Sequence, residues 1–309
     1  MRLDTSVLAA LATAFFWTVT ALSFEYAGRR IGSFALNFLR LVLGSLFLGA
    51  YGLATRGRFL PSDAPAAAWL WLGASGLVGL VLGDLCLFQA FIDIGSRIAM
   101  LVYATAPAMT ALLGFAVLGE GLGAVQAGGM ALTLAGIALV VLGKRGAGET
   151  PARAAGAAGG GRRARGLALA FAAAVGQAGG LILSKLGAGS GAGAMDPFAG
   201  TQIRVLAGVA GFALLSAATG SLRGVLGALR DRRALASLGL GSFFGPFLGV
   251  SLSLLAVQSG NAAVASALMS LVPVLIIAPS ALIMKERVTG REILGALVAT
   301  GGAAVLALA

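Results

Sequence analysis

Three ionisable side chains, Arg40, Asp84 and Arg204, lie within long apolar stretches of the sequence. Burying a charge in such a stretch is costly, so each of them needs a partner or a function. Arg40 lies about two helical turns into the stretch 34–54, and Asp84 about two turns before the end of 68–91. The spacing therefore predicts an ion pair between Arg40 and Asp84. In the alternative interpretation both arginines extend toward the polar boundary, and Asp84 only neutralises one of them.

Two prolines, Pro107 and Pro273, fall near the centres of two other apolar stretches. A proline inside a helix bends it and frees the carbonyl four residues earlier, which is Met269 for Pro273. Hydroxyl groups beside these kinks could bind a polar solute, although the same pattern also occurs as ordinary helix packing. Trp17 and Gln177, at roughly corresponding places in the two halves of the chain, are the first candidates for lining a cavity. The full set of candidate lining residues is Trp17, Thr20, Phe88, Gln89, Tyr103, Thr105, Gln177, Ser184, Phe244, Ser251, Met269 and Ser270.

The sequence lacks the residues that several kinds of chemistry require. It contains no histidine and a single cysteine, Cys86, so a Ser-His-Asp triad, an intrachain disulfide and a thiolate cluster are excluded. We therefore expect no enzyme activity, no metal site and no cofactor. The net charge of +11 comes from short basic clusters between apolar segments, a pattern typical of membrane proteins rather than of nucleic-acid binding.

The composition requires a lipid environment. Of the 309 residues, 59% are hydrophobic and only 11% are charged, whereas soluble domains are nearer to a quarter charged. A helix needs about 20 apolar residues to cross the hydrocarbon core. The sequence thus predicts an all-α integral membrane protein with ten transmembrane helices, at 6–24, 34–54, 68–91, 98–118, 124–142, 166–185, 198–219, 234–257, 262–283 and 292–308.

An internal repeat divides these helices into two sets of five. The segment from Phe34 to Arg40 matches the segment from Phe198 to Arg204, and further residues recur 166 positions apart. The sequence therefore predicts a first repeat at 1–143, a basic Gly/Ala/Arg linker at 144–165, and a second repeat at 166–309. Because five is an odd number, the second repeat enters the membrane inverted, and such repeats enclose a central cavity in many secondary transporters. The pairs at the offset of 166 are Gly79 and Gly245, Gly83 and Gly249, Pro107 and Pro273, Glu120 and Glu286, and Gly129 and Gly295.

The charged residues follow the repeat only in part. The second half keeps an arginine, Arg204, but has Val250 where Asp84 stands in the first half. Glu120 and Glu286 precede the fifth and tenth predicted spans, where we expect each carboxylate to stabilise the N-terminal helix dipole.

A proline-centred fourth span ending in Leu118-Gly-Glu120, and a ninth ending in Met284-Lys-Glu286, resemble the EamA-type members of the drug/metabolite transporter superfamily. The resemblance covers essentially the whole chain as two five-helix units. Members with this layout include aromatic amino acid exporters of the YddG type, and other relatives move drugs, cations or nucleotide sugars. The resemblance implies a cavity surrounded by spans one, three, four, six, eight and nine.

The basic residues predict an orientation. Of the 22 Lys and Arg residues, sixteen lie on the side of the linker and four on the side of the termini, and the other two are Arg40 and Arg204. The positive-inside rule then places the linker in the cytoplasm and both termini outside. We expect a multi-pass protein of a bacterial cytoplasmic (inner) membrane.

These observations favour a secondary transporter that exports small metabolites by alternating access. Amino acids with apolar or aromatic side chains are the favoured solutes, because the candidate lining residues are largely neutral. The alternative is efflux of drugs or lipophilic cations, which would need a buried carboxylate such as Asp84 or Glu25. The expected partners are the small-molecule solute and the lipid bilayer, without nucleic acid; the sequence leaves the oligomeric state open.

Overall fold

A computed structural model describes residues 4–94, 99, 102–143, 160–190, 193–275, 277, 279 and 289–308, and this part of the chain is helical without strands. The linker residues 144–159 and the predicted dipole residue Glu286 lie outside it. The first half contains α1 (Thr5–Ile31), α2 (Ser33–Arg56), α3 (Ala66–Ser75), π-helix η1 (Gly76–Gly83), α4 (Asp84–Ile94), α6 (Ala106–Leu118) and α7 (Ala124–Gly143).

The second half repeats this order. It contains α9 (Gly160–Ala188), α10 (Pro197–Thr219), the short α11 (Leu222–Ala228), α12 (Arg232–Ser242), π-helix η3 (Phe243–Gly249), α13 (Val250–Ser259), α14 (Ala262–Met269), α15 (Val272–Leu275) and α17 (Gly290–Leu308).

Side chains and glycines set several of the helix ends. Asp196 and Asp231 accept hydrogen bonds from the backbone N–H groups in the first turns of α10 and α12. Gly57, at φ 68°, and Gly220, at φ 67°, end α2 and α10 in the left-handed conformation that glycine adopts most easily.

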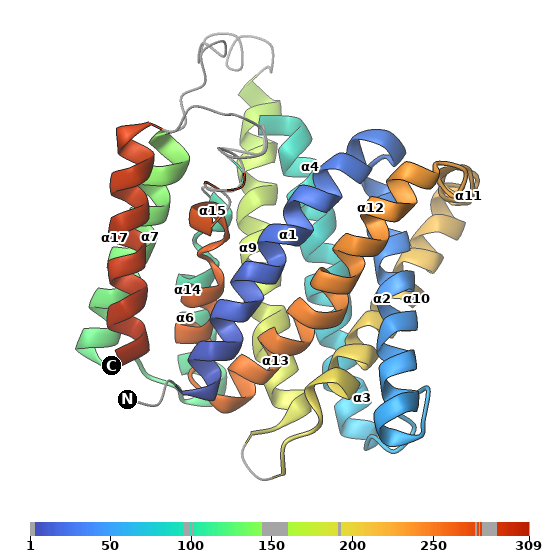
Figure 1. The fold of residues 1–309 in the computed structure, drawn as a ribbon, viewed down its shortest axis with the longest axis horizontal. Coiled ribbons are helices and arrows are strands. Elements are labelled where there is room, and N and C mark those ends of the chain that lie inside the picture. The colour runs from blue at the N-terminus through green and yellow to red at the C-terminus, as the bar shows by residue number, and fades with distance from the viewer. Residues whose placement is uncertain are drawn as a thin grey trace.

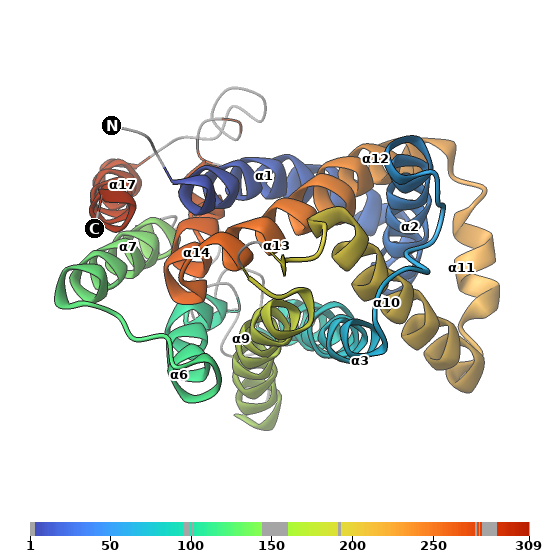
Figure 2. The ribbon, with the colours of Figure 1, turned by 90° about the horizontal axis from the view of Figure 1, so that it is seen from below.

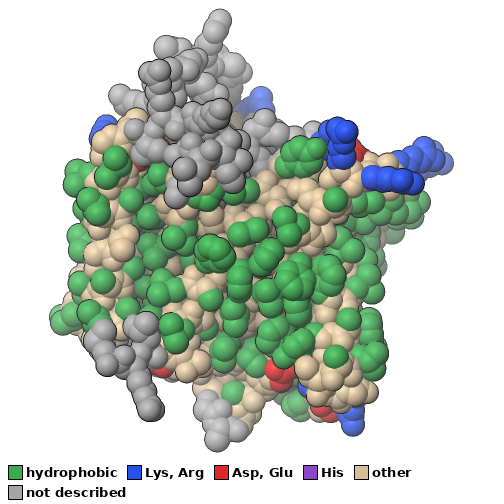
Figure 3. All heavy atoms as spheres, viewed as in Figure 1, with side chains coloured by type: hydrophobic (Ala, Val, Ile, Leu, Met, Phe, Trp, Pro, Cys, Tyr) green, Lys and Arg blue, Asp and Glu red, His purple; other side chains and the backbone are tan. Residues whose placement is uncertain are grey.

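Seven helical segments in the described residues are long and apolar enough to cross a membrane. The predicted spans 98–118, 124–142 and 262–283 correspond to shorter or interrupted helices there, so the count of ten stays a prediction. The outer surface is apolar, as contact with lipid requires: Leu214 is 72% exposed and Phe115 70% exposed. Hydrophobic side chains cover the middle of the face in Figure 3, and the basic side chains visible there gather toward its ends.

The helices form a bundle in which each packs against elements of the other half (Figures 1 and 2). α2 lies against α10, α7 against α17, η1 and α4 against α9, and η3 and α13 against α1. Both termini lie at one end of the bundle, the terminal end, whereas α7 ends and α9 begins at the other, the linker end (Figure 1). The first helices of the two halves, α1 and α9, therefore run in opposite directions.

The two π-helices occupy matched positions. η1 spans Gly76–Gly83 and η3 spans Phe243–Gly249, so their last residues are the repeat pair Gly83 and Gly249. Each lies within a longer span, α3–η1–α4 or α12–η3–α13. π-Helices are rare, and they are frequent at functional sites, so this pair directs attention to the helices that cross it.

Candidate functional site

The helices that contain the two central prolines are broken, and they break at equivalent places. A turn at residues 104–105 precedes α6, and a turn at residues 270–271 separates α14 from α15, again 166 positions later. Pro107 lies in the first turn of α6, and Pro273 is the second residue of α15. The sequence predicted a kink at each proline, and the structure has a helix break there. Proline begins a new helix here because the first turn does not use its missing N–H group.

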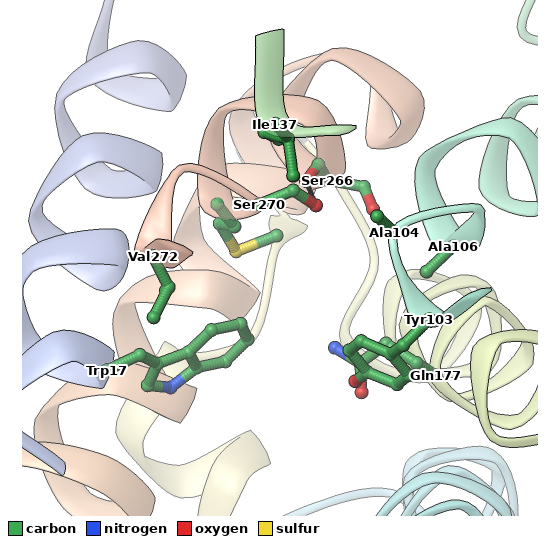
Figure 4. Close-up of a pocket in the computed structure, with 10 residues that line it drawn as sticks. Trp17, Tyr103, Ala104, Ala106, Ile137, Gln177, Ser266, Ser270 and Val272 are labelled. Atoms are coloured by element: carbon green, nitrogen blue, oxygen red, sulfur yellow. Dashed lines mark hydrogen bonds between the residues drawn. The ribbon is translucent and has the colours of Figure 1, made fainter. Parts of the chain in front are cut away.

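A cavity of about 150 Å³ lies between these two breaks. Both breaks contribute to its wall, together with α1, α7 and α9 (Figure 4). Its lining residues are Trp17, Tyr103, Ala104, Ala106, Ile137, Gln177, Ser266, Met269, Ser270 and Val272.

Trp17 and Gln177 line the cavity from α1 and α9. They are 160 residues apart and lie on opposite sides of it, with Tyr103 beside Gln177 (Figure 4). Each lies against the last glycine of a π-helix. A methyl group on Gly249 would lie 2.7 Å from the Trp17 ring, and one on Gly83 would lie 3.7 Å from the Gln177 backbone nitrogen. The absence of a side chain at these glycines lets α1 and α9 approach closely.

Hydroxyl, amide and aromatic groups give the cavity a neutral polar character. The hydroxyl of Ser270 donates to the Ser266 carbonyl at 2.8 Å, and the Thr110 hydroxyl donates to the Ser266 hydroxyl at 3.3 Å. No carboxylate or cationic side chain is among the lining residues in the described part of the chain. That part also contains no group of three or more acidic, histidine or cysteine side chains able to hold a metal ion.

Comparison with known proteins agrees with this two-part architecture. The EamA-like transporter family matches the chain twice, over residues 4–142 and 164–308. The chain belongs to the EamA-like transporter family. One crystal structure of a protein has a TM-score of 0.73 at 21% identity and covers 98% of this chain and 96% of its own, a likeness that shows the fold alone. No curated protein sequence matches the chain at a significant level.

The family consists of membrane transporters, so this EamA-like chain is a multi-pass membrane protein that transports small molecules. Five of its predicted lining residues line the cavity, and six others, whose side chains are described, do not. Thr105 donates to Val102 at the break before α6, and Gln89 donates to Asp93 at 3.1 Å near the linker end. The Phe88 side chain lies outside the described residues.

The remaining predicted residues make contacts inside the bundle. Thr20 donates to the Phe16 carbonyl, Ser184 to the Leu181 carbonyl and Ser251 to the Phe247 carbonyl. Phe244 packs on Phe16 with 5.4 Å between the ring centroids. None of Thr20, Ser184, Phe244 and Ser251 lines the cavity.

The Arg40 guanidinium donates a hydrogen bond to the Asp84 carboxylate, so the two residues lie together as the spacing predicts. Their side chains are 12% and 19% exposed. Arg204 is 4% exposed, and its Nε and Nη1 atoms have no hydrogen-bond partner.

Glu120 has a different role from the predicted one. Its carboxylate pairs with Lys185 Nζ at the end of α9 and accepts from the Ala262 backbone N–H at 2.9 Å. The Glu120 carboxylate therefore caps the N-terminus of α14, in the other half, rather than that of the helix that follows Glu120 in the sequence. Lys185 also donates to the Gly260 carbonyl, so this cluster joins α6, α9 and the α13–α14 turn at the terminal end of the EamA-like fold.

Five lining residues lie outside the predicted set: Ser266, Ala104, Ala106, Ile137 and Val272. All except Ser266 are apolar residues in an apolar sequence, so their residue type gives no signal. The repeat offset relates Ala104 to the predicted Ser270, which could have identified Ala104, but it relates Ala106 only to Val272, which was not predicted either. Ile137 of α7 had no such signal, because the resemblance implied that the fifth span lies outside the cavity.

Proposed function

We propose that this EamA-like transporter exports small metabolites, with apolar and aromatic amino acids as the favoured class, by alternating access across a bacterial cytoplasmic membrane. Ten crossings arranged as two inverted five-helix repeats are part of this proposal. The opposite directions of α1 and α9 and the matched π-helices support the inverted arrangement.

The single observation that carries the proposal is the cavity between two helix breaks at equivalent positions. Secondary transporters with inverted repeats bind solutes near the midplane, where discontinuous helices present unpaired backbone groups. The α6 N-terminus begins at this cavity, and its helix dipole favours a negatively charged group such as an amino acid carboxylate.

The size and polarity of the cavity favour a small, neutral or zwitterionic solute. Its volume of about 150 Å³ is below the roughly 300–1,000 Å³ typical of pockets for drug-sized ligands. Hydroxyl and amide groups suit the polar end of an amino acid, and Trp17 and Tyr103 suit an apolar or aromatic side chain.

The same lining argues against efflux of lipophilic cations. Such a solute requires a buried carboxylate to balance its charge, and the described lining has none. Asp84, a membrane-embedded carboxylate, already receives a hydrogen bond from Arg40.

The decisive experiment is counterflow in proteoliposomes, with a panel of labelled amino acids compared with a cationic drug. Accumulation of apolar or aromatic amino acids against empty-liposome controls supports the proposal. Accumulation of the drug without any amino acid would favour the cation-efflux alternative.

We further propose that the linker is cytoplasmic and both termini are outside, from the distribution of Lys and Arg residues. The test uses a Gly160→Cys substitution in a Cys86→Ala background. Only membrane-permeant thiol reagents should label this cysteine in intact cells. Labelling by an impermeant reagent would reverse the orientation without affecting the fold.

A further inference from the structure

The two helix breaks present equivalent backbone positions to the cavity. Six of the lining residues form three pairs at the repeat offset of 166: Tyr103 and Met269, Ala104 and Ser270, and Ala106 and Val272. In the first break the Thr105 N–H donates to the Val102 carbonyl at 3.0 Å. In the second break the Leu271 N–H donates to the Leu268 carbonyl at 3.2 Å. The two breaks therefore share one backbone arrangement, and their side chains distinguish them.

Each break leaves a backbone carbonyl at the cavity without a partner. Pro273 has no N–H group to donate to the Met269 carbonyl, and Pro107 leaves the Tyr103 carbonyl free in the same way. No other group in the described part of the chain donates to either carbonyl. Met269 is 2% exposed and lines the cavity, so its free carbonyl is buried there. A buried carbonyl without a donor is unfavourable, which favours binding of a donor group in the cavity.

A hydroxyl group distinguishes the second break from the first. Ser270 stands where the first break has Ala104. The Ser270 hydroxyl donates its proton to the Ser266 carbonyl at 2.8 Å, which leaves its oxygen free to accept a hydrogen bond. The Met269 carbonyl and the Ser270 hydroxyl oxygen are thus neighbouring acceptors at the end of α14. The C-terminus of a helix carries a partial negative charge, so this end favours a cationic donor.

The N-terminus of α6 lies beside this end of α14. α6 runs from Ala106 at the cavity toward Glu120, whose carboxylate accepts from the first residue of α14, Ala262. α14 therefore returns antiparallel to α6 and ends at the cavity, and a hydrogen bond of 3.3 Å between the Thr110 and Ser266 hydroxyls joins the two helices. Adjacent helix ends of opposite partial charge suit the ammonium and carboxylate groups of one α-amino acid. Because such a solute has no net charge, the lining needs no ionised side chain.

We propose that the Met269 carbonyl and the Ser270 hydroxyl bind the ammonium group of the transported amino acid, while its carboxylate faces the α6 N-terminus. The inference rests on the proposed function and deepens it, because it makes the ammonium group a requirement for recognition. Backbone carbonyls at broken transporter helices also suit alkali metal ions, which prefer the same oxygen ligands. The experiment therefore distinguishes these two cations.

The test measures competition with the counterflow of labelled L-phenylalanine. The competitors are unlabelled L-phenylalanine and 3-phenylpropanoate, which has a hydrogen atom in place of the ammonium group. In the wild type, phenylalanine should compete better by about tenfold or more. Ser270→Ala, which gives the second break the side chain of the first, should weaken competition by phenylalanine about tenfold. Competition by 3-phenylpropanoate should stay nearly unchanged.

A matched pair of proline variants tests the carbonyl itself. Pro273→Ala supplies an N–H group four residues after Met269, so the helix can close over the break and occupy the Met269 carbonyl. The preference for phenylalanine over 3-phenylpropanoate should then fall about tenfold. Pro107→Ala makes the same change at the Tyr103 carbonyl and should keep the preference, whatever its effect on the rate. Alanine has the higher helix propensity, so both variants should fold, and thermal stability is measured in parallel.

The outcomes separate this inference from the proposed function. Equal competition by the two compounds in the wild type, or an equal fall of the preference in both proline variants, would overturn the inference and leave amino acid transport standing. An unchanged preference in Ser270→Ala would overturn it even if Pro273→Ala did not fold. Loss of the preference when choline replaces sodium and potassium would assign the acceptors to an alkali metal ion and would also overturn it. If no amino acid of the panel is transported, the proposed function itself fails.

Discussion

Two helix crossings join the halves of the molecule at matched positions, and they are built differently. Where η1 crosses α9, four glycines meet: Gly79 and Gly83 on one side, Gly176 and Gly180 on the other. A methyl group on Gly180 would lie 3.1 Å from Gly79 Cα, and one on Gly176 would lie 3.0 Å from Gly83 Cα. Backbone packs directly on backbone at this crossing.

Where η3 crosses α1, glycines meet side chains. A methyl group on Gly245 would lie 2.8 Å from Thr20 Cγ2, and Gly249 lies against the Trp17 ring. Thr20 stands 160 residues before Gly180, and Trp17 stands 160 residues before Gln177. The same arrangement of a π-helix against the first helix of a half therefore occurs twice. At the crossing of η1 and α9 it brings the helices very close together, and at the crossing of η3 and α1 it holds the Trp17 ring at the cavity.

The ends of the two crossings differ as well. Ion pairs hold α9 at both ends, Arg165 with Asp93 near the linker end and Lys185 with Glu120 at the terminal end. Among the described side chains, α1 has an ion pair near the linker end, between Arg30 and Asp231, and none at its terminal end. At its terminal end, the Ser6 hydroxyl donates to the Ala256 carbonyl at 2.8 Å.

The largest effect should come from moving a side chain of the second crossing into the first. Gly180→Thr places the Thr20 side chain between two backbones, with no neighbouring side chain that could move away. Overpacking typically costs 1–3 kcal/mol, and with backbone on both sides we expect about 3 kcal/mol or more. The measurement is the fraction of folded protein in detergent and its Tm.

The matched control is Gly179→Thr, one residue away. A methyl group on Gly179 would lie 3.5 Å from Val78 Cγ1, which is ordinary contact. This variant should keep near wild-type stability. If Gly180→Thr is as stable as Gly179→Thr, the close backbone packing is not important for folding.

The sequence predicts the repeated parts of this molecule better than the contacts between its halves. The offset of 166 relates Pro107 to Pro273, and Trp17 and Gln177, at roughly corresponding places in the two halves, both line the cavity. The sequence could not reveal the π-helices, because a glycine-rich apolar segment has no hydrophobic periodicity that would distinguish a π-helix from an α-helix. The partners of Glu120 were missed because Lys185 and Ala262 lie far along the chain, and only the packed bundle brings them together.

The second prediction concerns the cavity at the crossings. Trp17→Ala or Gln177→Ala should alter apparent solute affinity or preference while expression and thermal stability stay near wild type. Loss of a lining contact should cost about 1–3 kcal/mol, or about tenfold or more in affinity. Counterflow over the amino acid panel measures this effect.

Trp69→Ala provides the control, because it removes the same side chain from a position that is 39% exposed on α3. It should leave solute affinity unchanged. Normal transport of the whole panel by both cavity variants would mean that α1 and α9 serve only as scaffold.

A third, smaller effect concerns the terminal end of α9. Lys185→Met removes the partner of a partly buried carboxylate, which keeps its hydrogen bond from Ala262. We therefore expect a loss of about 1–2 kcal/mol, below the 3–5 kcal/mol for breaking a fully buried pair. Glu120→Gln in the Lys185→Met background should cost less than Glu120→Gln alone, because the interaction is already absent. Additive losses in Tm would show that the two side chains are not coupled.

The smallest effect should come from the exposed pair near the linker end of α1. Asp231 accepts from the Ala234 backbone N–H at 3.0 Å and from Arg30 Nε at 2.7 Å, and these bonds lower the pKa of its carboxyl group, the backbone bond most strongly. A carboxyl group with a lowered folded pKa stabilises the fold above its unfolded pKa of about 3.9, and this contribution is lost as the pH falls through the folded value.

Arg30→Gln should therefore reduce Tm only slightly at neutral pH, because exposed ion pairs contribute little and the bond from Ala234 remains. Asp231→Ala should reduce Tm more, since it removes the helix cap as well as the ion pair. The difference in Tm between wild type and Arg30→Gln should disappear in acid, once Asp231 is protonated in both proteins. A difference that persists below the folded pKa of Asp231 would mean that Arg30 stabilises α1 through packing on Tyr26, whose ring centre lies 5.8 Å from the Arg30 guanidinium, rather than through its charge.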